Sequence, residues 1–424
     1  MKKLLVSLVA VATAMAPFAG HAEGGDHGAG FRTTSCHIGD AIVPGSSGVT
    51  LTVDDDGGAD FTTIGAAVAA AGEGDTILIK DGTYHEAVEI HTPGLRIRGE
   101  HRNGVILDGD SEKDVGLNAL ADRIVLENMT GHNYTGTAFR FAHQTGYWGR
   151  YLTAYNNHGY GIYAYDARCG QIDNSYGSGN ADSAFYIGEC YPCDAVIHDV
   201  VAEENALGYS GTNAGGNLEI RDSAWNDNAL GIVPNSLIGE ARPPQRGATI
   251  HHNTITGTRA DVPGDGIGGT YYGVGIALAG TSGNSVYGNA ISGAQRVGIL
   301  VVPLPEDNGN VWIPSGNTIW GNAIVSPPDG YDLAQGAGSG PGNCWADNNP
   351  TGQTAPPMIE SIFDCGAPVT APGGDPRVEF ELVAQTAGID GTRSQADWRT
   401  WPAPELNFPE APASLGGWIP ALGL

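Results

Sequence analysis

Two carboxylates 23 positions apart are the residues in this chain best suited to catalysis. Asp166 and Glu189 occupy equivalent places in neighbouring copies of a repeat, which would bring them about 5 Å apart. Carboxyl groups about 5–5.5 Å apart suit a retaining glycosidase, in which one is the acid and the other the nucleophile. The same pair could bind Ca²⁺ with the help of carbonyl oxygens. The plain alternative is that both side chains face solvent at turns.

Aromatic and polar residues in the same repeats could bind a sugar polymer. Tyr163 and Tyr186 share one position of the repeat and could stack on sugar rings. Asn213 shares the position of the two carboxylates one repeat further on, and Arg168 lies nearby. We therefore expect a ligand-binding face over about residues 160–250, because stacked repeats align equivalent side chains.

The first 22 residues are typical of a secretory signal peptide. Lys2 and Lys3 precede an apolar stretch from Leu4 to Ala19, and Gly20-His21-Ala22 supplies small residues for cleavage. The stretch contains Pro17 and is short for a membrane span. We therefore expect a secreted or periplasmic product without a membrane span.

Charge argues against one class of partner. The chain has 20 Lys and Arg against 47 Asp and Glu, a formal charge of −27. Nucleic acid is a polyanion that proteins bind with clusters of Lys and Arg, so we exclude it as a partner. A uronate polymer would also be repelled unless Ca²⁺ or local arginines offset its charge.

Six cysteines in an exported protein are most simply disulfides. Cys169 and Cys193 lie one repeat apart, so stacked coils would bring them within reach of a disulfide, and Cys169 with Cys190 is the competing pair. Cys344 and Cys365 could close a loop near the C-terminus.

A repeat of about 23 residues determines the fold class. Each copy holds three short apolar runs, with Asn, Asp or Gly where the chain must turn through a left-handed backbone. Such coils stack about 4.8 Å apart with parallel pairing, and aligned Asn side chains can hydrogen-bond in a ladder. We therefore predict an all-β, right-handed parallel β-helix. The first runs end at Asn128, Tyr151, Asn174, Asp199, Asp222, Asn253, Asn289 and Asn322, and a second series is Asn133, Asn157, Asn180, Asn205 and Asn228.

The two ends of the array of repeats differ from its middle. Residues Asp60 to Gly72 predict a short helix with Asp60 or Thr62 as N-cap, whose apolar face would cover the open end of the solenoid. Strands are expected at Thr76–Ile79, Val88–Ile90 and Leu95–Arg98. The predicted segments are a signal peptide (1–22), an N-terminal arm (23–48), the β-helix (49–333) and an irregular Gly/Pro-rich tail (334–424).

The helix and the strands after it, DFTTIGAAVAAAGEGDTILIKDGTYHEAVEI, followed by Asn-rich coils, resemble pectate-lyase-like β-helix proteins. The resemblance covers roughly residues 50–330 and implies the fold. That group contains lyases, hydrolases, epimerases, esterases and proteins without activity, so the resemblance leaves the activity open.

The string from Glu240 to Asn253 is similar to a pectate-lyase pattern in which two arginines flank a proline. By that resemblance Arg242 would abstract the proton beside a uronate carboxylate, and Arg246 would bind the substrate. The spacing is one residue shorter than in the family, and the family's calcium-binding aspartates are not recognisable. The alternative is a Pro-rich turn whose arginines pair with Glu240 and other acids.

Two hypotheses follow. In the first, the protein is an exported β-helix that binds a polysaccharide on residues 160–250 and cleaves it as a lyase or a hydrolase, with calcium as the one conceivable cofactor. In the second, it is a non-catalytic structural or maturation protein of the periplasm or cell surface. Cysteine pairing, glycan identity and oligomeric state stay open.

Overall fold

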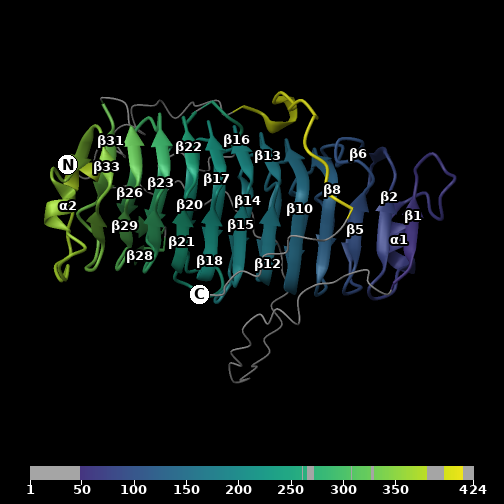
Figure 1. The fold of residues 1–424 in the computed structure, drawn as a ribbon, viewed down its shortest axis with the longest axis horizontal. Helices are drawn as coiled ribbons and strands as arrows, with labels where there is room; N and C mark the ends of the chain where they lie inside the picture. Colours follow the sequence, from purple (N-terminus) through teal and green to yellow (C-terminus); the bar gives the residue numbers. More distant parts are fainter. Residues whose placement is uncertain are drawn as a thin grey trace, which may run out of the picture.

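The computed structural model describes residues 48–259, 261–264, 272–306, 308–325, 329–379 and 396–413. Figure 1 shows strands stacked side by side along the long axis of the molecule. Strand β1 (Thr50–Val53) and helix α1 (Ile64–Ala70) lie at one end, and helix α2 (Ile359–Ile362) lies at the other. The predicted signal peptide, and the arm up to residue 47, lie outside the described residues.

Each coil contributes strands to two long parallel sheets. Sheet A has 21 strands and contains two strand rows, and sheet B has 11 strands. The first row of sheet A comprises β1, β2 (Thr76–Ile79), β5 (Arg96–Gly99), β8 (Ile124–His132), β10 (Thr145–Tyr155), β12 (Arg168–Asp173), β15 (Ala195–His198), β18 (Gly215–Arg221), β21 (Arg246–His251), β24 (Ser285–Tyr287), β29 (Thr318–Trp320) and β32 (Cys344–Ala346). The second row comprises β3 (Gly82–Tyr84), β6 (Val105–Asp108), β13 (Tyr176–Ser178), β16 (Val201–Glu203), β19 (Ala224–Asn226), β22 (Thr254–Thr256), β25 (Ala290–Ser292), β30 (Ala323–Val325) and β33 (Asn349–Pro350), and the long strands β8 and β10 span both rows.

Sheet B supplies the remaining side of each coil. Its strands are β4 (Val88–Ile90), β7 (Val115–Ala119), β9 (Thr137–Ala142), β11 (Ile162–Tyr165), β14 (Ser183–Gly188), β17 (Leu207–Thr212), β20 (Leu230–Asn235), β23 (Val274–Ala279), β26 (Val297–Val302), β31 (Tyr331–Gln335) and β34 (Gln353–Ala355). Strands β27 (Leu304–Pro305) and β28 (Val311–Trp312) form a separate antiparallel pair. The pairing confirms the predicted all-β, right-handed parallel β-helix.

Period-two alternation builds the core, since every second side chain of a strand points inward. In sheet A, Ile172 pairs with Ile197, which pairs with Ile220, and all three are fully buried. Burial of such a side chain contributes roughly 1.5–3 kcal/mol, so each coil is stabilised mainly by its neighbours.

Asparagine ladders fix the corners. Asn157 donates through Nδ2 to Oδ1 of Asn180, which donates to Asn205, which donates to Asn228, each at 2.9 Å. These predicted corner residues are therefore confirmed as a hydrogen-bonded ladder. Asn133, which the same pattern included, instead donates to Asp108.

Both ends depart in detail from the prediction. The N-cap of α1 is Thr63, whose side chain accepts from the Ala66 N–H, because Asp60 is held by Thr52 instead. The repeat also continues past residue 333: β32, β33 and β34 pair with the preceding coil despite the Gly- and Pro-rich composition.

The last described segment returns along the solenoid. It contains the short 3₁₀ helix η2 (Trp398–Thr400), and Figure 1 shows it, in yellow, running from near β16 toward β8. Asn103 Nδ2 donates to the Phe408 carbonyl, and the Ala411 N–H donates to Asn128. Phe408 and Ala411 therefore lie against coils more than 280 positions earlier in the chain. No helix among the described residues is long and apolar enough to cross a membrane.

Candidate functional site

The outward face of sheet B carries a column of polar and aromatic side chains. Strand pairing places Arg140 beside Tyr163, Tyr163 beside Tyr186, and Tyr186 beside Ser210. Their neighbours along the strands, such as Ile162, point into the core, which forces these residues outward. The predicted alignment of the two tyrosines is therefore confirmed.

The tyrosine rings contact one another. Tyr163 stacks on Tyr186 with ring centroids 4.5 Å apart, and Tyr160 lies 4.4 Å from Tyr163. The Arg140 guanidinium lies 5.9 Å from the Tyr163 ring centroid. Because the ring faces of Tyr163 are engaged, it would meet a sugar through its edge and hydroxyl group. Tyr165 is less deeply buried than Tyr163, and its ring centroid lies 5.9 Å from that of Tyr163 and 5.1 Å from that of His143.

A connecting segment, residues 236–245, lies over this column and is called the strap. Asn213 Nδ2 donates to the Leu237 carbonyl at 2.7 Å, and the Leu237 N–H donates back to Asn213 Oδ1. The Ala241 N–H donates to Glu189 Oε2 at 2.9 Å. Arg242 pairs with Asp166, with 2.7 Å between Nη2 and Oδ1. The strap is thus attached to three successive coils.

Glu240, at the centre of the strap, is a carboxyl group with a strongly altered proton affinity. Burial, together with the charge of Glu189 and a hydrogen bond between the two side chains, raises the pKa of Glu240 to about 8. Its Oε2 atom is buried and has no hydrogen-bond partner. Glu240 therefore stays largely protonated at neutral pH and could donate a proton.

A second acid lies near the same column. Burial raises the pKa of Asp182 to about 6, although hydrogen bonds from Tyr160 and Ser183 oppose the rise. Burial also raises the pKa values of Tyr160, Tyr163 and Tyr186, so their hydroxyl groups stay protonated. A group of acids with shifted pKa values in one place is a feature of catalytic sites.

The predicted catalytic residues gather at the strap. Asp166 and Glu189 both lie at corners with positive φ, directly after the paired residues Tyr165 and Gly188. Asp166 contacts Arg242 and also His143, at 3.2 Å, whereas Glu189 is 4% exposed and contacts the strap backbone. The roles assigned to Asp166, Glu189 and Arg242 stay predictions.

The predicted binding residues are more dispersed. The guanidinium of Arg246 lies 3.6 Å from the Tyr191 ring centroid and donates to the Pro244 carbonyl. Arg168 is exposed, and Asn213 is buried with its amide group used to hold the strap. Tyr163 and Tyr186 are thus the two predicted binding residues that the structure brings into the acid cluster.

The disulfide prediction is half correct. Cys344–Cys365 is present, but Cys193 pairs with Cys190 and not with Cys169. Sequence spacing placed Cys169 and Cys193 in neighbouring coils, and the Cys169 N–H does donate to the Cys193 carbonyl. A turn at Tyr191-Pro192, however, brings Cys190 to 4.7 Å from Cys193 between Cα atoms, so the local pair forms. Cys169 is disulfide-bonded as well.

Other potential metal ligands cluster away from Asp166 and Glu189. Within the described ranges, groups of three potential ligands are Asp81 with Glu100 and His101, and His85 with Asp108 and Asp110. Within the groups His101 contacts Asp81 and His85 contacts Asp110, and the outside lysines Lys80 and Lys113 pair with Glu100 and Asp110. Neither group includes Asp166 or Glu189, and calcium at that pair stays a prediction.

Sequence reasoning missed five members of the cluster: Arg140, Tyr160, Tyr165, Asp182 and Glu240, the last of which it considered only as a partner for the arginines. The repeat register could have found Arg140, which occupies the Tyr163 position one coil earlier. Glu240 could not be found this way, because the strap lies outside the repeat.

Known structures with a similar fold were found, all distant in sequence. The A-module of the Azotobacter vinelandii mannuronan C-5 epimerase AlgE4 is 14% identical, with a TM-score of 0.49, covering 68% of this chain and 89% of that one. DFA-IIIase from Arthrobacter chlorophenolicus A6 without its lid is 12% identical, with a TM-score of 0.46 and coverage of 74% and 98%. The tailspike protein of E. coli bacteriophage HK620, in complex with a pentasaccharide, is 11% identical, with a TM-score of 0.49 and coverage of 72% and 60%.

At sequence identities of 11–14%, the structural similarity concerns the fold and says nothing about the activity of this chain. A comparison with protein families found no match, and a comparison with curated protein sequences found none either.

Proposed function

We propose that this is an exported protein that binds a polysaccharide on the face formed by β9, β11, β14 and β17 and cleaves it with Glu240 as proton donor. The observation that carries the proposal is the protonated Glu240 carboxyl group beside Glu189 and the tyrosine column. Tyrosine and carboxyl groups provide the hydrogen bonds that sugar hydroxyls require.

Glu189 acts directly on the donor, because its charge helps to raise the pKa of Glu240. The two carboxyl groups would therefore act as one proton-sharing unit, in which Glu240 protonates the glycosidic oxygen as the C–O bond breaks. Protonation of that oxygen serves hydrolysis and β-elimination alike.

A panel of neutral and uronate polysaccharides, incubated with the protein with and without Ca²⁺, tests the proposal. Reducing ends without new ultraviolet absorbance would mean hydrolysis. Calcium-dependent absorbance from an unsaturated product, lost in Arg242→Ala, would mean β-elimination and support the role of Arg242 and calcium. Silence in both readouts across the panel would contradict cleavage.

One observation favours a non-catalytic protein instead. Asp166, Glu189 and Arg242 all hold the strap in place, which is a structural task. If that is their whole role, Asp166→Ala and Glu189→Ala would loosen the strap, and proteolysis near residue 240 would become faster. The wild-type protein would then show no turnover in the first place. An enzyme would lose turnover in variants that keep their fold.

A further inference from the structure

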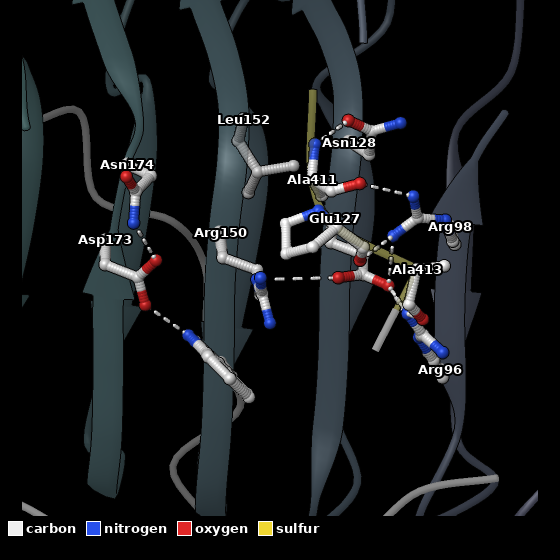
Figure 2. A network of polar contacts seen from close by, with 12 residues as sticks. Arg96, Arg98, Glu127, Asn128, Arg150, Leu152, Asp173, Asn174, Ala411 and Ala413 are labelled. Atoms are coloured by element: carbon white, nitrogen blue, oxygen red, sulfur yellow. Dashed lines mark hydrogen bonds and ion pairs between the residues drawn. The ribbon is translucent and has the colours of Figure 1, made fainter. Parts of the chain in front are cut away.

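Figure 2 shows a cluster of charged side chains on the first strand row of sheet A. Glu127 is fully buried, and its Oε1 accepts from Arg96 at 2.5 Å and from Arg98 at 3.1 Å. Arg98 also donates to the Ala411 carbonyl at 2.7 Å, so the C-terminal segment lies against the cluster. Because Arg150 is 2% exposed as well, the cluster anchors the C-terminal segment and leaves no opening for a ligand.

A group of charged side chains on the second strand row is open to solvent instead. Strand pairing places Tyr84 beside Leu107, and Asp108 beside His132. His85 follows Tyr84, so His85, Asp108 and His132 share one position of three successive coils. Tyr84 and Leu107 are buried in the core, which turns the residues after them outward. With coils about 4.8 Å apart, the three side chains form a column.

A turn after β6 adds a second carboxylate to this column. The Asp110 N–H donates to Asp108 Oδ1 at 2.9 Å, and Asp110 Oδ1 lies 2.7 Å from His85 Nδ1. The potential ligand atoms of His85, Asp108 and Asp110 all lie within 4.8 Å of one another. Imidazole nitrogens together with carboxylate oxygens are typical ligands of zinc and similar divalent transition metals.

His132 supplies the observation that points to an ion. Its Nδ1 atom is buried and has no hydrogen-bond partner, and it lies 3.9 Å from Asp108 Oδ1, too far for a hydrogen bond. The ring stacks on Tyr155, with centroids 4.7 Å apart and 7° between the planes, which fixes its orientation. A buried nitrogen without a partner costs free energy, and an ion beside Asp108 would provide that partner.

The column combines an accessible end with a sheltered one. The side chain of His85 is 52% exposed, whereas that of His132 is 14% exposed. An ion can therefore enter from solvent past His85 and Asp110 and reach the inner ligands. Small rotations of the exposed side chains would bring their ligand atoms to the zinc bond length of about 2.0–2.2 Å.

Neighbouring side chains hold the two carboxylates in place. Asn133 Nδ2 donates to Asp108 Oδ1 at 3.1 Å. Lys113 pairs with Asp110 through Oδ2, which leaves Oδ1 directed at His85. Hydrogen-bonded carboxylates of this kind are common among metal ligands, because the outer contacts fix the orientation of the ligand.

We propose that His85, Asp108, Asp110 and His132 bind a divalent transition metal ion such as zinc. The ion would take the place of the proton between His85 and Asp110, and that proton would go to solvent. Bound there, it would join three successive coils near β1. The site is on sheet A and goes beyond the proposed function, which concerns sheet B.

Titration calorimetry of the untagged, chelator-treated full chain with ZnCl₂ tests the proposal. The wild type should bind zinc and melt at a higher temperature with it. His85→Gln should weaken zinc binding at least about tenfold, since even the loss of a residue that supports a ligand costs this much. The matched control is His101→Gln, because His101 forms a group of similar composition with Asp81 and Glu100 that has one histidine. This variant should bind zinc like wild type.

Absence of zinc binding in the wild type would overturn the proposal, as would unchanged affinity in a folded His85→Gln. Excess Ca²⁺ should not displace the zinc, because calcium takes oxygen ligands, and displacement would contradict a site with two imidazoles.

If His85→Gln does not fold, anomalous scattering from wild-type crystals soaked in ZnCl₂ decides instead. Zinc bonded to His85 and His132 supports the site, and zinc elsewhere alone refutes it. Glu240→Gln should bind zinc like wild type, so a failure of the proposed function leaves this test intact.

Discussion

At the scale of single residues, the account depends on the proton held by Glu240. Water stabilises an ionised carboxylate, and burial beside Glu189 withdraws that stabilisation, so the pKa rises to about 8. The proton is therefore available at neutral pH, where an ordinary glutamate would have lost it. Tyr165, which interacts with Glu189, connects this pair to the less buried part of the face.

Cleavage should depend on pH through this group. The rate should fall as the pH rises through about 8, because only the protonated carboxyl donates. Glu240→Gln should lower the rate by about 10²–10⁴-fold and remove this alkaline limb. Initial rates across the pH range check both statements, with Glu219→Gln on sheet A as control. An unchanged profile in Glu240→Gln would exclude Glu240 as the donor.

The free energy of unfolding should also fall as the pH rises. The folded-state pKa of Glu240 lies above its unfolded value, so the native state is favoured while the group is protonated, below about pH 4. That contribution is lost as the pH rises through about 8. The wild type should therefore lose more stability between pH 5 and 9 than Glu240→Gln, by roughly a few kcal/mol. Denaturant titrations at several pH values measure the difference, and parallel curves would refute it.

At the scale of elements, the repeat register was predictable and the strap was not. Equivalent residues such as Tyr163 and Tyr186 recur at a fixed spacing because each coil pairs residue by residue with the next. The contact of Arg242 with Asp166 joins residues 76 apart and follows from no repeat. Repeat spacing also predicted the wrong disulfide partner for Cys193, because a local turn brings Cys190 closer than Cys169.

The asparagine ladder should be a strong stabilising element. Asn180 accepts from Asn157 and donates to both Asn205 and the Ala154 carbonyl, all in buried positions. Asn180→Ala would leave several polar groups unpaired and should destabilise the fold by about 2–4 kcal/mol. Chemical unfolding measures this change.

The exposed Asn349, on edge strand β33, is the matched control for the ladder. Asn349→Ala should change the unfolding free energy by less than about 0.5 kcal/mol. Equal effects of the two substitutions would contradict a special contribution from the ladder.

At the scale of the whole molecule, shape and charge work against each other. Stacked coils bury a continuous core, so stability comes from neighbour-to-neighbour contacts along the axis. A formal charge of −27 opposes that compact state through self-repulsion. Arg140 on sheet B and Arg150 on sheet A are among the few positive charges on the outward faces.

Salt should therefore stabilise the protein. Raising NaCl from low to moderate concentration shortens the screening length to about 8–10 Å or less and weakens the repulsion among the acids. The melting temperature should rise by several degrees. Scanning calorimetry over a salt series checks this, and a melting temperature that falls with salt would mean that ion pairs outweigh the repulsion.

The central claim is that the tyrosine and carboxyl face of sheet B binds a glycan. One set of binding titrations tests this claim most directly. The oligosaccharide selected by the panel is titrated into wild type, Tyr165→Ala and Tyr287→Ala, a tyrosine of sheet A. We predict that Tyr165→Ala loses at least about tenfold in affinity while Tyr287→Ala binds like wild type. Wild-type affinity in a folded Tyr165→Ala would contradict the claim.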